Sequence, residues 1–156
     1  MTQHISTSPF ALSVKRSRAG LGLYANEPIP KNSFVIEYFG KILSNEEADR
    51  RGGKYLFDIS SRRTVDGSTW KNLARYINHS CRPNCEVEVK RGRIYIYAKR
   101  AIEPGEELGY DYGKEYVDEF IKPRGCRCNH CAVGSNASLV PAKNKRKART
   151  KTKRHK

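Results

Sequence analysis

The chain has 156 residues, enough for one compact domain with a buried core and too few for two domains of ordinary size. Hydrophobic residues make up 37% of the sequence and aromatic residues 10%, so most of the chain is expected to fold. The formal net charge is +15, but nine of the 31 Lys and Arg residues fall within residues 141–156, where no acidic residue occurs. The strongest basicity therefore belongs to a C-terminal tail, whose composition is typical of a disordered segment, a nucleic-acid anchor or a nuclear localisation signal.

No stretch approaches the ~18 apolar residues of a membrane span, and the first residues lack the charged start and apolar middle of a secretory signal peptide. We therefore expect an intracellular protein with no membrane partner. In a reducing compartment its five cysteines are expected to be metal ligands, a nucleophile or core residues rather than disulfides.

The first half of the chain predicts short strands separated by turns. Two apolar stretches flank a glycine-containing turn, which predicts a hairpin within residues 11–25. Residues 33–43 are rich in β-branched and aromatic side chains and predict one further strand, bounded by residues 30–32 and by Gly40. Ser44 stands three residues before a Glu, the spacing of a capping box, and predicts one or two helical turns. Residues 55–59 and 63–67 then predict a pair of short strands.

In the second half, apolar and polar residues alternate over residues 85–90 and 93–99 on either side of an Arg-Gly turn. This pattern predicts the clearest hairpin in the chain. A short strand is expected within residues 108–113, and a helical turn within residues 114–125. About eight or nine short strands with little helix indicate an all-β or β-rich fold.

Three of the five cysteines gather in the sequence CRCNHC, as Cys126, Cys128 and Cys131. Three soft thiolates need only one more ligand to complete a tetrahedral zinc site. Either Cys81 or Cys85 can supply it if the chain returns there, and His130 is a competing ligand inside the cluster. The other interpretation is a group of reduced surface thiols. A metal cross-link would fasten a C-terminal segment that has too few apolar residues to be held by burial alone.

Five segments carry a further pattern in order along the chain: SRAGLGLYA at 17–25, VIEYFGKIL at 35–43, RYINHSCRPNC at 75–85, GEELGYDYG at 105–113 and CRCNHC at 126–131. Together they resemble the SET-domain family of protein lysine methyltransferases. The two long signatures, at 75–85 and 105–113, are the most specific part of the resemblance. It implies a β-rich fold of several small sheets with a knot-like threading, followed by a zinc-binding post-SET segment.

The resemblance implies a SET domain at residues 1–113 and a cysteine-rich post-SET segment at 114–134, and composition indicates a basic disordered tail at 135–156. It also implies S-adenosylmethionine as the methyl donor, zinc, and a protein substrate with an extended lysine-containing segment, such as a histone or another DNA-associated protein. The tail is a candidate DNA contact. The expected location is the nucleus and chromatin in a eukaryote or a host, and the cytoplasm if the protein acts inside a bacterium.

The cofactor-binding residues implied by the resemblance are Gly20, Leu21, Gly22, Arg75, Asn78 and His79. Glycines in the turn would also let the backbone approach a ligand closely. The resemblance assigns the fourth zinc position to Cys81 and makes Cys85 a core residue.

Methyl transfer to an amine needs the amine, the methyl carbon and the sulfur in line, and it needs the lysine unprotonated. Orientation lowers the barrier, and an apolar, aromatic channel lowers the pKa of the amine. No Ser-His-Asp triad or carboxylate pair is therefore required, and we find no candidate for either. By resemblance, Tyr112 is the catalytic tyrosine, Tyr110 limits the product to mono- or dimethyl-lysine, and Tyr38 lines the channel.

An alternative is a SET-like chromatin or nucleic-acid-binding module with little catalytic activity. The family usually spaces its post-SET cysteines as Cys-x-Cys-x4-Cys, whereas the second gap here is two residues, which favours this alternative. Intact Tyr112, Asn78 and His79 favour the enzyme. Residues 148–151 of the tail, ARTK, match the methylated N terminus of a core histone, so Lys151 is a candidate site of automethylation.

Overall fold

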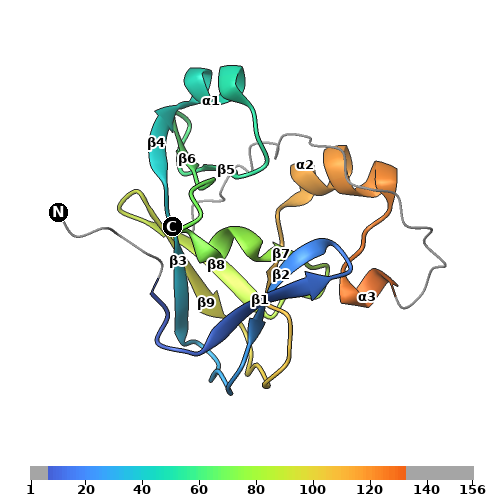
Figure 1. Ribbon diagram of the computed structural model, residues 1–156. Coiled ribbons are helices and arrows are strands. Elements are labelled where there is room, and N and C mark those ends of the chain that lie inside the picture. The colour runs from blue at the N-terminus through green and yellow to red at the C-terminus, as the bar shows by residue number, and fades with distance from the viewer. Residues whose placement is uncertain (1–6, 133–156) are drawn as a thin grey trace.

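The structure is a computed structural model that describes residues 7–132 of the chain (Figure 1). In this part, ten short strands form four small sheets and the helices are short, which confirms the β-rich architecture. Among the described residues, no helix is long and apolar enough to cross a membrane. The predicted tail at residues 135–156, with Lys151, lies outside the described residues.

The first sheet is the predicted hairpin with the glycine turn. Strand β1 (Leu12–Ser17) pairs antiparallel with β2 (Gly20–Ala25). Gly20 has a φ of +113°, a backbone conformation in which a side chain would be strained. The N–H of Leu108 donates to the carbonyl oxygen of Leu23 at 2.8 Å, which attaches the hairpin to a segment far along the chain.

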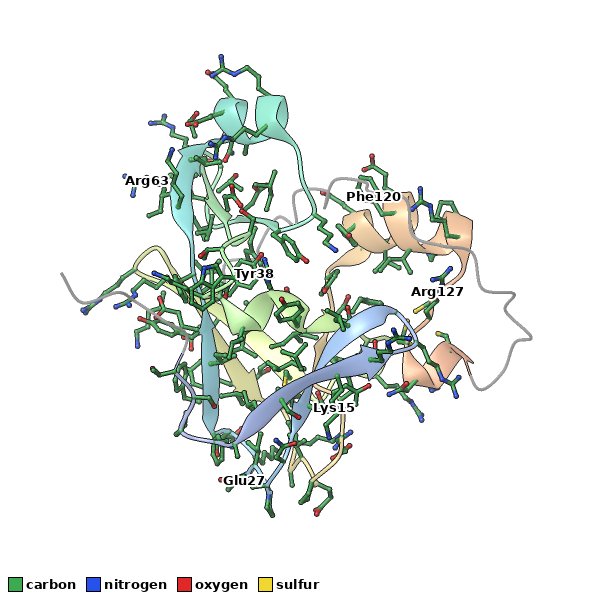
Figure 2. The ribbon with its side chains drawn as sticks, viewed as in Figure 1. Lys15, Glu27, Tyr38, Arg63, Phe120 and Arg127 are labelled. Atoms are coloured by element: carbon green, nitrogen blue, oxygen red, sulfur yellow. The ribbon has the colours of Figure 1, made fainter. Side chains whose placement is uncertain are left out.

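A three-stranded antiparallel sheet contributes much of the core. Its order is β3-β9-β8, with the bounds Phe34–Tyr38, Arg93–Ala98 and Cys85–Lys90. The predicted β8–β9 hairpin is confirmed, because Ile94, Ile96 and Ala98 alternate into the core with no exposed surface. Cys85 is buried in the same core, as expected. Tyr38, the last residue of β3, also points into the interior (Figure 2).

The third sheet has the order β4-β6-β5, with the bounds Lys41–Ser44, Arg63–Asp66 and Leu56–Asp58. It confirms the predicted strand pair. The strand predicted between residues 30–32 and Gly40 is found as β3, and a further short strand, β4, follows Gly40. A Cβ atom on Gly40 would lie 1.8 Å from the carbonyl oxygen of Asp66. This close packing against β6 requires a residue without a side chain between β3 and β4.

Helix α1 (Asn45–Arg51) follows β4 directly and ends at Gly52. The Oγ of Ser44 accepts a hydrogen bond from the N–H of Glu47 at 3.2 Å, so the predicted helical turns and their N-terminal cap are confirmed.

The fourth sheet joins the two long signature segments. Strand β7 (Asn78–His79) pairs in parallel with β10 (Gly109–Tyr110), and the 3₁₀ helix η1 (Leu73–Tyr76) precedes it. A two-residue ladder provides few hydrogen bonds, and the buried side chain of Asn84 adds two more. Its Oδ1 accepts from the N–H of Gly109 at 2.9 Å, and its Nδ2 donates to the carbonyl oxygen of Glu107 at 2.9 Å.

The chain after β10 is helical, which confirms the prediction of a helical turn there. The elements are α2 (Lys114–Tyr116), the π-helix η2 (Val117–Ile121), the 3₁₀ helix η3 (Lys122–Arg124) and α3 (Asn129–Ala132). Asp118 forms ion pairs with Lys114 and Lys122, each four residues away. Figure 1 shows α3 below α2, with α3 close to the hairpin of β1 and β2.

Candidate active site and metal centre

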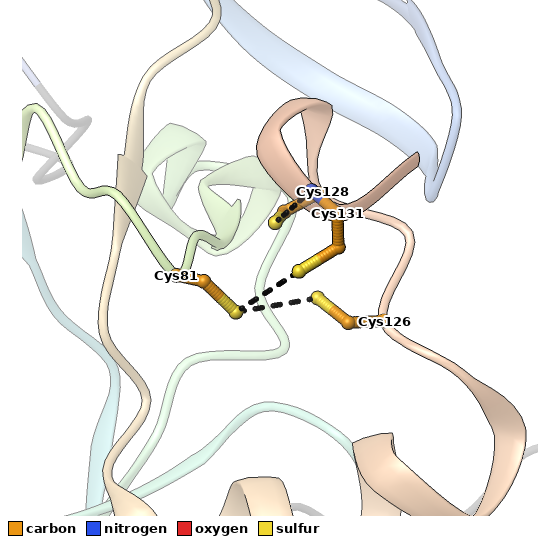
Figure 3. Close-up of side chains that lie close together, drawn as sticks. All are labelled: Cys81, Cys126, Cys128 and Cys131. Carbon is orange, nitrogen blue, oxygen red and sulfur yellow. Dashed lines mark hydrogen bonds between the residues drawn. The ribbon is translucent and has the colours of Figure 1, made fainter. Parts of the chain in front are cut away.

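Four cysteines lie together, as Figure 3 shows: Cys81, Cys126, Cys128 and Cys131. Their four sulfur atoms are all within 4.8 Å of one another, and the Cys81 Sγ lies 3.6 Å from the Sγ atoms of both Cys126 and Cys131. Four thiolates about 2.3 Å from a tetrahedral zinc ion would be separated by about 3.8 Å. The sulfur positions therefore fit a structural zinc site, and the short gap in CRCNHC does not keep the thiols apart.

The competing ligands take other positions. His130 is exposed, and its ring is not among the groups that gather around the possible metal position. Cys85 is buried in the core. Burial acts to raise the pKa of the Cys128 thiol, but backbone N–H groups of Cys81 and Cys131 outweigh it and lower the pKa to about 7. Burial instead raises the pKa of Cys81 well above its usual value and that of Cys126 to about 11, so these two thiols would release protons when metal binds.

A pocket lies where the hairpin turn, the two signature segments and the cysteine segment meet. It is lined by Ala19, Asn78, His79, Ser80, Glu107, Leu108, Gly109, Arg127, Cys128 and Asn129. Two predicted cofactor-binding residues, Asn78 and His79, are thus brought to it, together with the residue before the glycine turn. The same cysteine segment that gathers the sulfurs also forms one wall of the pocket, and Figure 2 shows Arg127 on this segment near the hairpin.

Asn78 connects three parts of this pocket. Its Nδ2 donates to the carbonyl oxygen of Leu21 at 2.8 Å and to Oε1 of Glu107 at 2.9 Å, and it lies 3.3 Å from the hydroxyl of Ser17. With the amide nitrogen held in this way, the side chain has a fixed orientation at the wall of the pocket.

Glu107 was not among the predicted site residues, although it stands within the GEEL signature. A Cβ atom on Gly22 would lie 2.4 Å from its Oε1. The missing side chain of Gly22 therefore makes room for the Glu107 carboxylate, a requirement that the glycine turn alone did not indicate. Gly20 has open space around its Cβ position, so its positive φ is the reason for glycine there.

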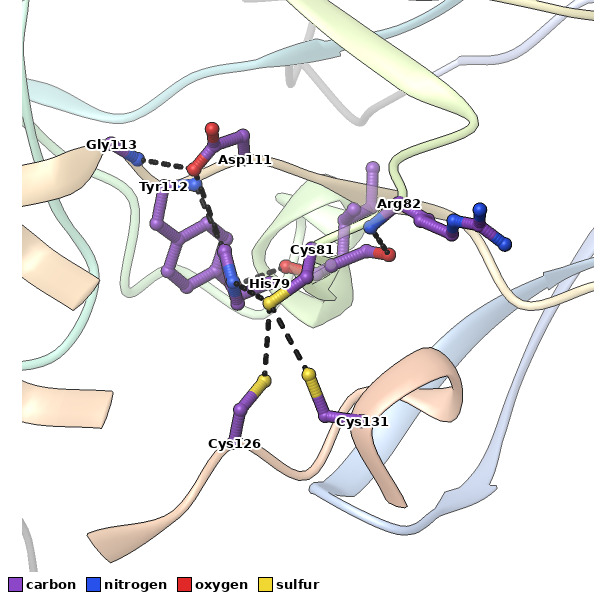
Figure 4. Close-up of polar contacts among 10 residues, drawn as sticks. His79, Cys81, Arg82, Asp111, Tyr112, Gly113, Cys126 and Cys131 are labelled. Carbon is purple, nitrogen blue, oxygen red and sulfur yellow. Dashed lines mark hydrogen bonds and ion pairs between the residues drawn. The ribbon is translucent and has the colours of Figure 1, made fainter. Parts of the chain in front are cut away.

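His79 lies between the cysteine cluster and Tyr112 (Figure 4). Its Nε2 is 3.4 Å from the Sγ of Cys81, and its Nδ1 accepts from the backbone N–H of Tyr112 at 3.2 Å. The Oδ1 of Asp111 is 3.8 Å from the same Nδ1. Burial lowers the pKa of His79, while the charge of Asp111 acts in the opposite direction. His79 is therefore a neutral imidazole at physiological pH.

The three predicted active-site tyrosines belong to one row of aromatic rings. In order, the row contains Tyr38, Phe57, Tyr110, Tyr112, Tyr116 and Phe120, with neighbouring ring centroids 4.8–6.5 Å apart. Phe57, Tyr116 and Phe120 were missed by sequence analysis, because their place in the row depends on elements that are distant along the chain.

Two tyrosine hydroxyls of this row, those of Tyr38 and Tyr112, are held by backbone carbonyl groups. Tyr38 donates to the carbonyl oxygen of Tyr55 at 2.7 Å, and Tyr112 donates to the carbonyl oxygen of Ile77. Burial and the neighbouring tyrosines Tyr110 and Tyr116 raise the pKa of Tyr112 well above its usual value. Tyr112 is therefore a neutral hydroxyl, and it can act as a donor or orient a nearby amine rather than as a phenolate base.

Arg75 is not part of the pocket lining. Its guanidinium donates to the carbonyl oxygen of Ser68 and to the hydroxyl of Tyr76, each at 2.6 Å, and lies over the ring of Tyr55 at 5.2 Å. The contact of Arg75 with a cofactor stays a prediction.

The strand pair, pocket and cysteine cluster occur in a chain whose residues 20–113 match the SET domain family. The chain therefore belongs to the SET domain family. Its identity is 45% over 130 residues with Histone-lysine N-methyltransferase trr of Drosophila melanogaster, an alignment that covers 75% of this chain and 5% of the relative.

Two further relatives bear similar names. Histone-lysine N-methyltransferase 2D of Homo sapiens is 43% identical over 135 residues, covering 78% of this chain and 2% of the relative. Histone-lysine N-methyltransferase, H3 lysine-4 specific, of Schizosaccharomyces pombe is 49% identical over 106 residues, covering 59% of this chain and 11% of the relative. The chain thus spans only a small part of the length of these curated relatives.

Proposed function

We propose that this protein is an S-adenosylmethionine-dependent protein-lysine N-methyltransferase. The observation that carries the proposal is the parallel pairing of β7 with β10. Through it, Asn78 and His79 at the pocket lie beside Tyr110 and Tyr112 in the aromatic row. A donor site and an aromatic lysine channel would therefore share one pair of strands, and the names of the relatives support the same reaction.

The proposed roles follow from these positions. Asn78 and His79, with the glycine turn, hold S-adenosylmethionine, which supplies a methyl group on a positively charged sulfur. Tyr38, Tyr110 and Tyr112 line the channel for the substrate lysine. This largely apolar surrounding would lower the pKa of the amine, so that the lysine loses its proton to water. The bound donor would supply the methyl group to the neutral nitrogen as the methyl–sulfur bond breaks, and S-adenosylhomocysteine, a neutral thioether, would leave. The protein contributes orientation and desolvation rather than a general base.

The four cysteines would hold zinc with a structural role. When bound, zinc supplies a cross-link between the loop after β7 and the segment from Cys126 to Cys131. Because Arg127, Cys128 and Asn129 also line the pocket, this cross-link would keep one wall of the donor site in place.

The proposed substrate is a lysine in an extended segment of a histone or another DNA-associated protein. A relative whose name specifies H3 lysine-4 supports the choice of a histone, and its name also supports an action on chromatin. The basic tail would add a DNA contact that weakens steeply with salt. A product of mono- or dimethyl-lysine is proposed from the identity of Tyr110.

The test is transfer of labelled methyl groups from S-adenosylmethionine to nucleosomes, to free histones and to the protein itself. We expect label on a histone lysine, found by mass spectrometry. Absence of label on all three, together with absence of S-adenosylmethionine binding by calorimetry, would favour the alternative of a binding module. Self-labelling that is lost in Lys151→Arg would identify the tail as an additional substrate.

Tyr110→Phe is expected to shift the product toward higher methylation. Tyr110 is buried within the aromatic row, and removing its hydroxyl leaves space where an added methyl group can fit. Mass spectrometry of the product should show a larger trimethyl fraction than with the unaltered protein. Tyr97→Phe on β9, the same chemical change outside the row, is the control; an identical product distribution in Tyr110→Phe would contradict the assigned role.

Gly22→Ala is expected to weaken S-adenosylmethionine binding by about tenfold, or ~1.4 kcal/mol. The new methyl group would lie 2.4 Å from Oε1 of Glu107 and displace the carboxylate that holds Asn78. Calorimetric titration measures the change. Combining Gly22→Ala with Glu107→Asp should recover part of the affinity, because the Asp side chain is one methylene shorter and leaves room for the new methyl group. Unchanged binding in Gly22→Ala would show that this contact does not support the donor site.

A further inference from the structure

The side chain of His79 makes a different contact with each ring nitrogen. A backbone N–H can only donate, so the Nδ1 that faces the N–H of Tyr112 at 3.2 Å must be the unprotonated nitrogen. The ring proton therefore lies on Nε2, which faces the Sγ of Cys81 at 3.4 Å. His79 thus accepts from the backbone two residues after β10 and donates toward the cysteine cluster; Figure 4 draws both contacts.

The surroundings favour this arrangement. The side chain of His79 is 6% exposed, and its contact with Tyr112 is partly buried, whereas Cys81 is exposed. The other polar group near the ring is Asp111, whose Oδ1 accepts from the N–H of Gly113 at 2.9 Å and remains 3.8 Å from Nδ1. The side chain of Asp111 is 65% exposed. The Tyr112 ring meets the imidazole edge to face, with centroids 5.6 Å apart, and limits rotation of the ring.

We propose that His79 is a positioning residue that joins the metal centre to the active-site strand. Its Nε2–H donates a hydrogen bond to the Cys81 thiolate, and its Nδ1 holds the backbone N–H of Tyr112. The inference rests on the proposed zinc site and adds a second role to a residue assigned above only to the cofactor. The placement of Tyr112 is then connected to the metal centre through one ring.

The two hydrogen bonds of His79 are expected to affect zinc affinity on one side and the backbone at Tyr112 on the other. A hydrogen bond to a metal-bound thiolate stabilises its negative charge and fixes its direction, and loss of such an outer-shell partner typically reduces metal affinity by about 10–100-fold. On the other side, a buried backbone N–H without an acceptor is costly, so removal of Nδ1 loosens the chain at Tyr112.

Two substitutions separate the two contacts. In His79→Asn, the short amide can place its oxygen near the position of Nδ1 and accept from Tyr112, but it does not reach Cys81. In His79→Gln, the longer amide can place its NH₂ near the position of Nε2 and donate to Cys81, but it leaves the Tyr112 N–H without its acceptor. The zinc dissociation constant is measured by chelator competition, and hydrogen exchange of the Tyr112 amide by NMR; neither readout depends on methyl transfer.

We expect a crossed result. His79→Asn should lose about 10–100-fold in zinc affinity and retain slow exchange at Tyr112. His79→Gln should retain zinc affinity within about threefold, while exchange at Tyr112 accelerates by at least about tenfold. Cobalt-loaded His79→Asn should also show a shifted thiolate charge-transfer band. Asp111→Asn, which changes the neighbouring charge and neither bond, is the matched control and should leave zinc affinity and exchange near those of the unaltered protein.

Equal zinc affinity in both His79 variants and the unaltered protein would overturn the proposal, as would equal losses of both properties in both variants. A measurement on the unaltered, zinc-loaded protein covers the case in which the variants do not fold. Long-range proton–nitrogen NMR of the His79 ring should find the proton on Nε2, and a proton on Nδ1 would overturn the proposal. Methyl transfer can fail while these results hold, so the two proposals are tested separately.

Discussion

Tyr112→Phe should reduce the rate of methyl transfer by about 10²–10³-fold, the usual effect of removing one oriented hydrogen-bonding group from an active site. The change deletes a single hydroxyl, which is buried and donates to the carbonyl oxygen of Ile77. The ring itself remains packed between Tyr110 and Tyr116, so the fold and the channel wall should persist. Single-turnover transfer to histone substrates measures the effect on the chemical step.

The control for this prediction is Tyr97→Phe, which removes a hydroxyl from β9 outside the aromatic row and should transfer at the original rate. Binding of S-adenosylmethionine by Tyr112→Phe should change less than about threefold, because Tyr112 does not line the pocket. A Tyr112→Phe protein that transfers methyl groups as fast as the original would contradict the catalytic assignment.

Loss of the metal centre should have the second large effect. Cys126→Ser removes one of four sulfurs that lie within 4.8 Å of one another, and we expect it to abolish stoichiometric zinc binding. Without the cross-link, the segment containing Arg127 and Asn129 is no longer held against the pocket. We expect S-adenosylmethionine affinity to fall by at least about tenfold, or ~1.4 kcal/mol, and thermal stability to fall as well.

Elemental analysis of the purified protein, calorimetric titration and thermal unfolding measure these three quantities. Cys85→Ala is the matched control, because Cys85 lies in the core and outside the cluster; it should lower stability and keep one bound zinc. Zinc that persists at full stoichiometry in Cys126→Ser, or donor affinity that is independent of zinc, would contradict the proposed structural role.

The two effects concern residues that follow the two strands of the same short pair. Strands β7 and β10 carry the pocket residues Asn78 and Gly109, and Cys81 and Tyr112 stand two residues after the ends of these strands. A two-residue parallel ladder is too small to be stable alone. The Asn84 side chain, the His79 ring and the cysteine cluster supply the additional connections that hold it.

Local structure was largely predictable from sequence because its causes lie within a few residues. The Ser44 cap satisfies an N–H three residues away, and the alternation over β8 and β9 places Ile94 and Ile96 in the core. Three cysteines in six residues already indicated a metal site. The signature residues identified by resemblance were enough to name the family, and its match to residues 20–113 agrees.

Contacts between distant segments could not be read from those patterns. The need for a residue without a side chain between β3 and β4 depends on the close approach of Gly40 to Asp66, and the need for Gly22 depends on Glu107, 85 positions later. The intrinsic strand or turn preference of a residue depends on neither contact. Residue spacing likewise left both Cys81 and Cys85 as possible fourth ligands, because it does not say which of them lies near the other three cysteines. The folded chain brings the sulfur of Cys81 to the cluster and buries Cys85 in the core.

The sequence by itself therefore determined the β-rich class, the short elements and the residue types available for chemistry, since these follow from hydrogen bonding and burial over short distances. The tertiary structure alone decided which of those groups meet. Parallel pairing of β7 with β10 placed His79 between Cys81 and Tyr112. Strands this far apart along the chain can form hydrogen bonds between their backbone N–H and C=O groups only when the whole domain is folded.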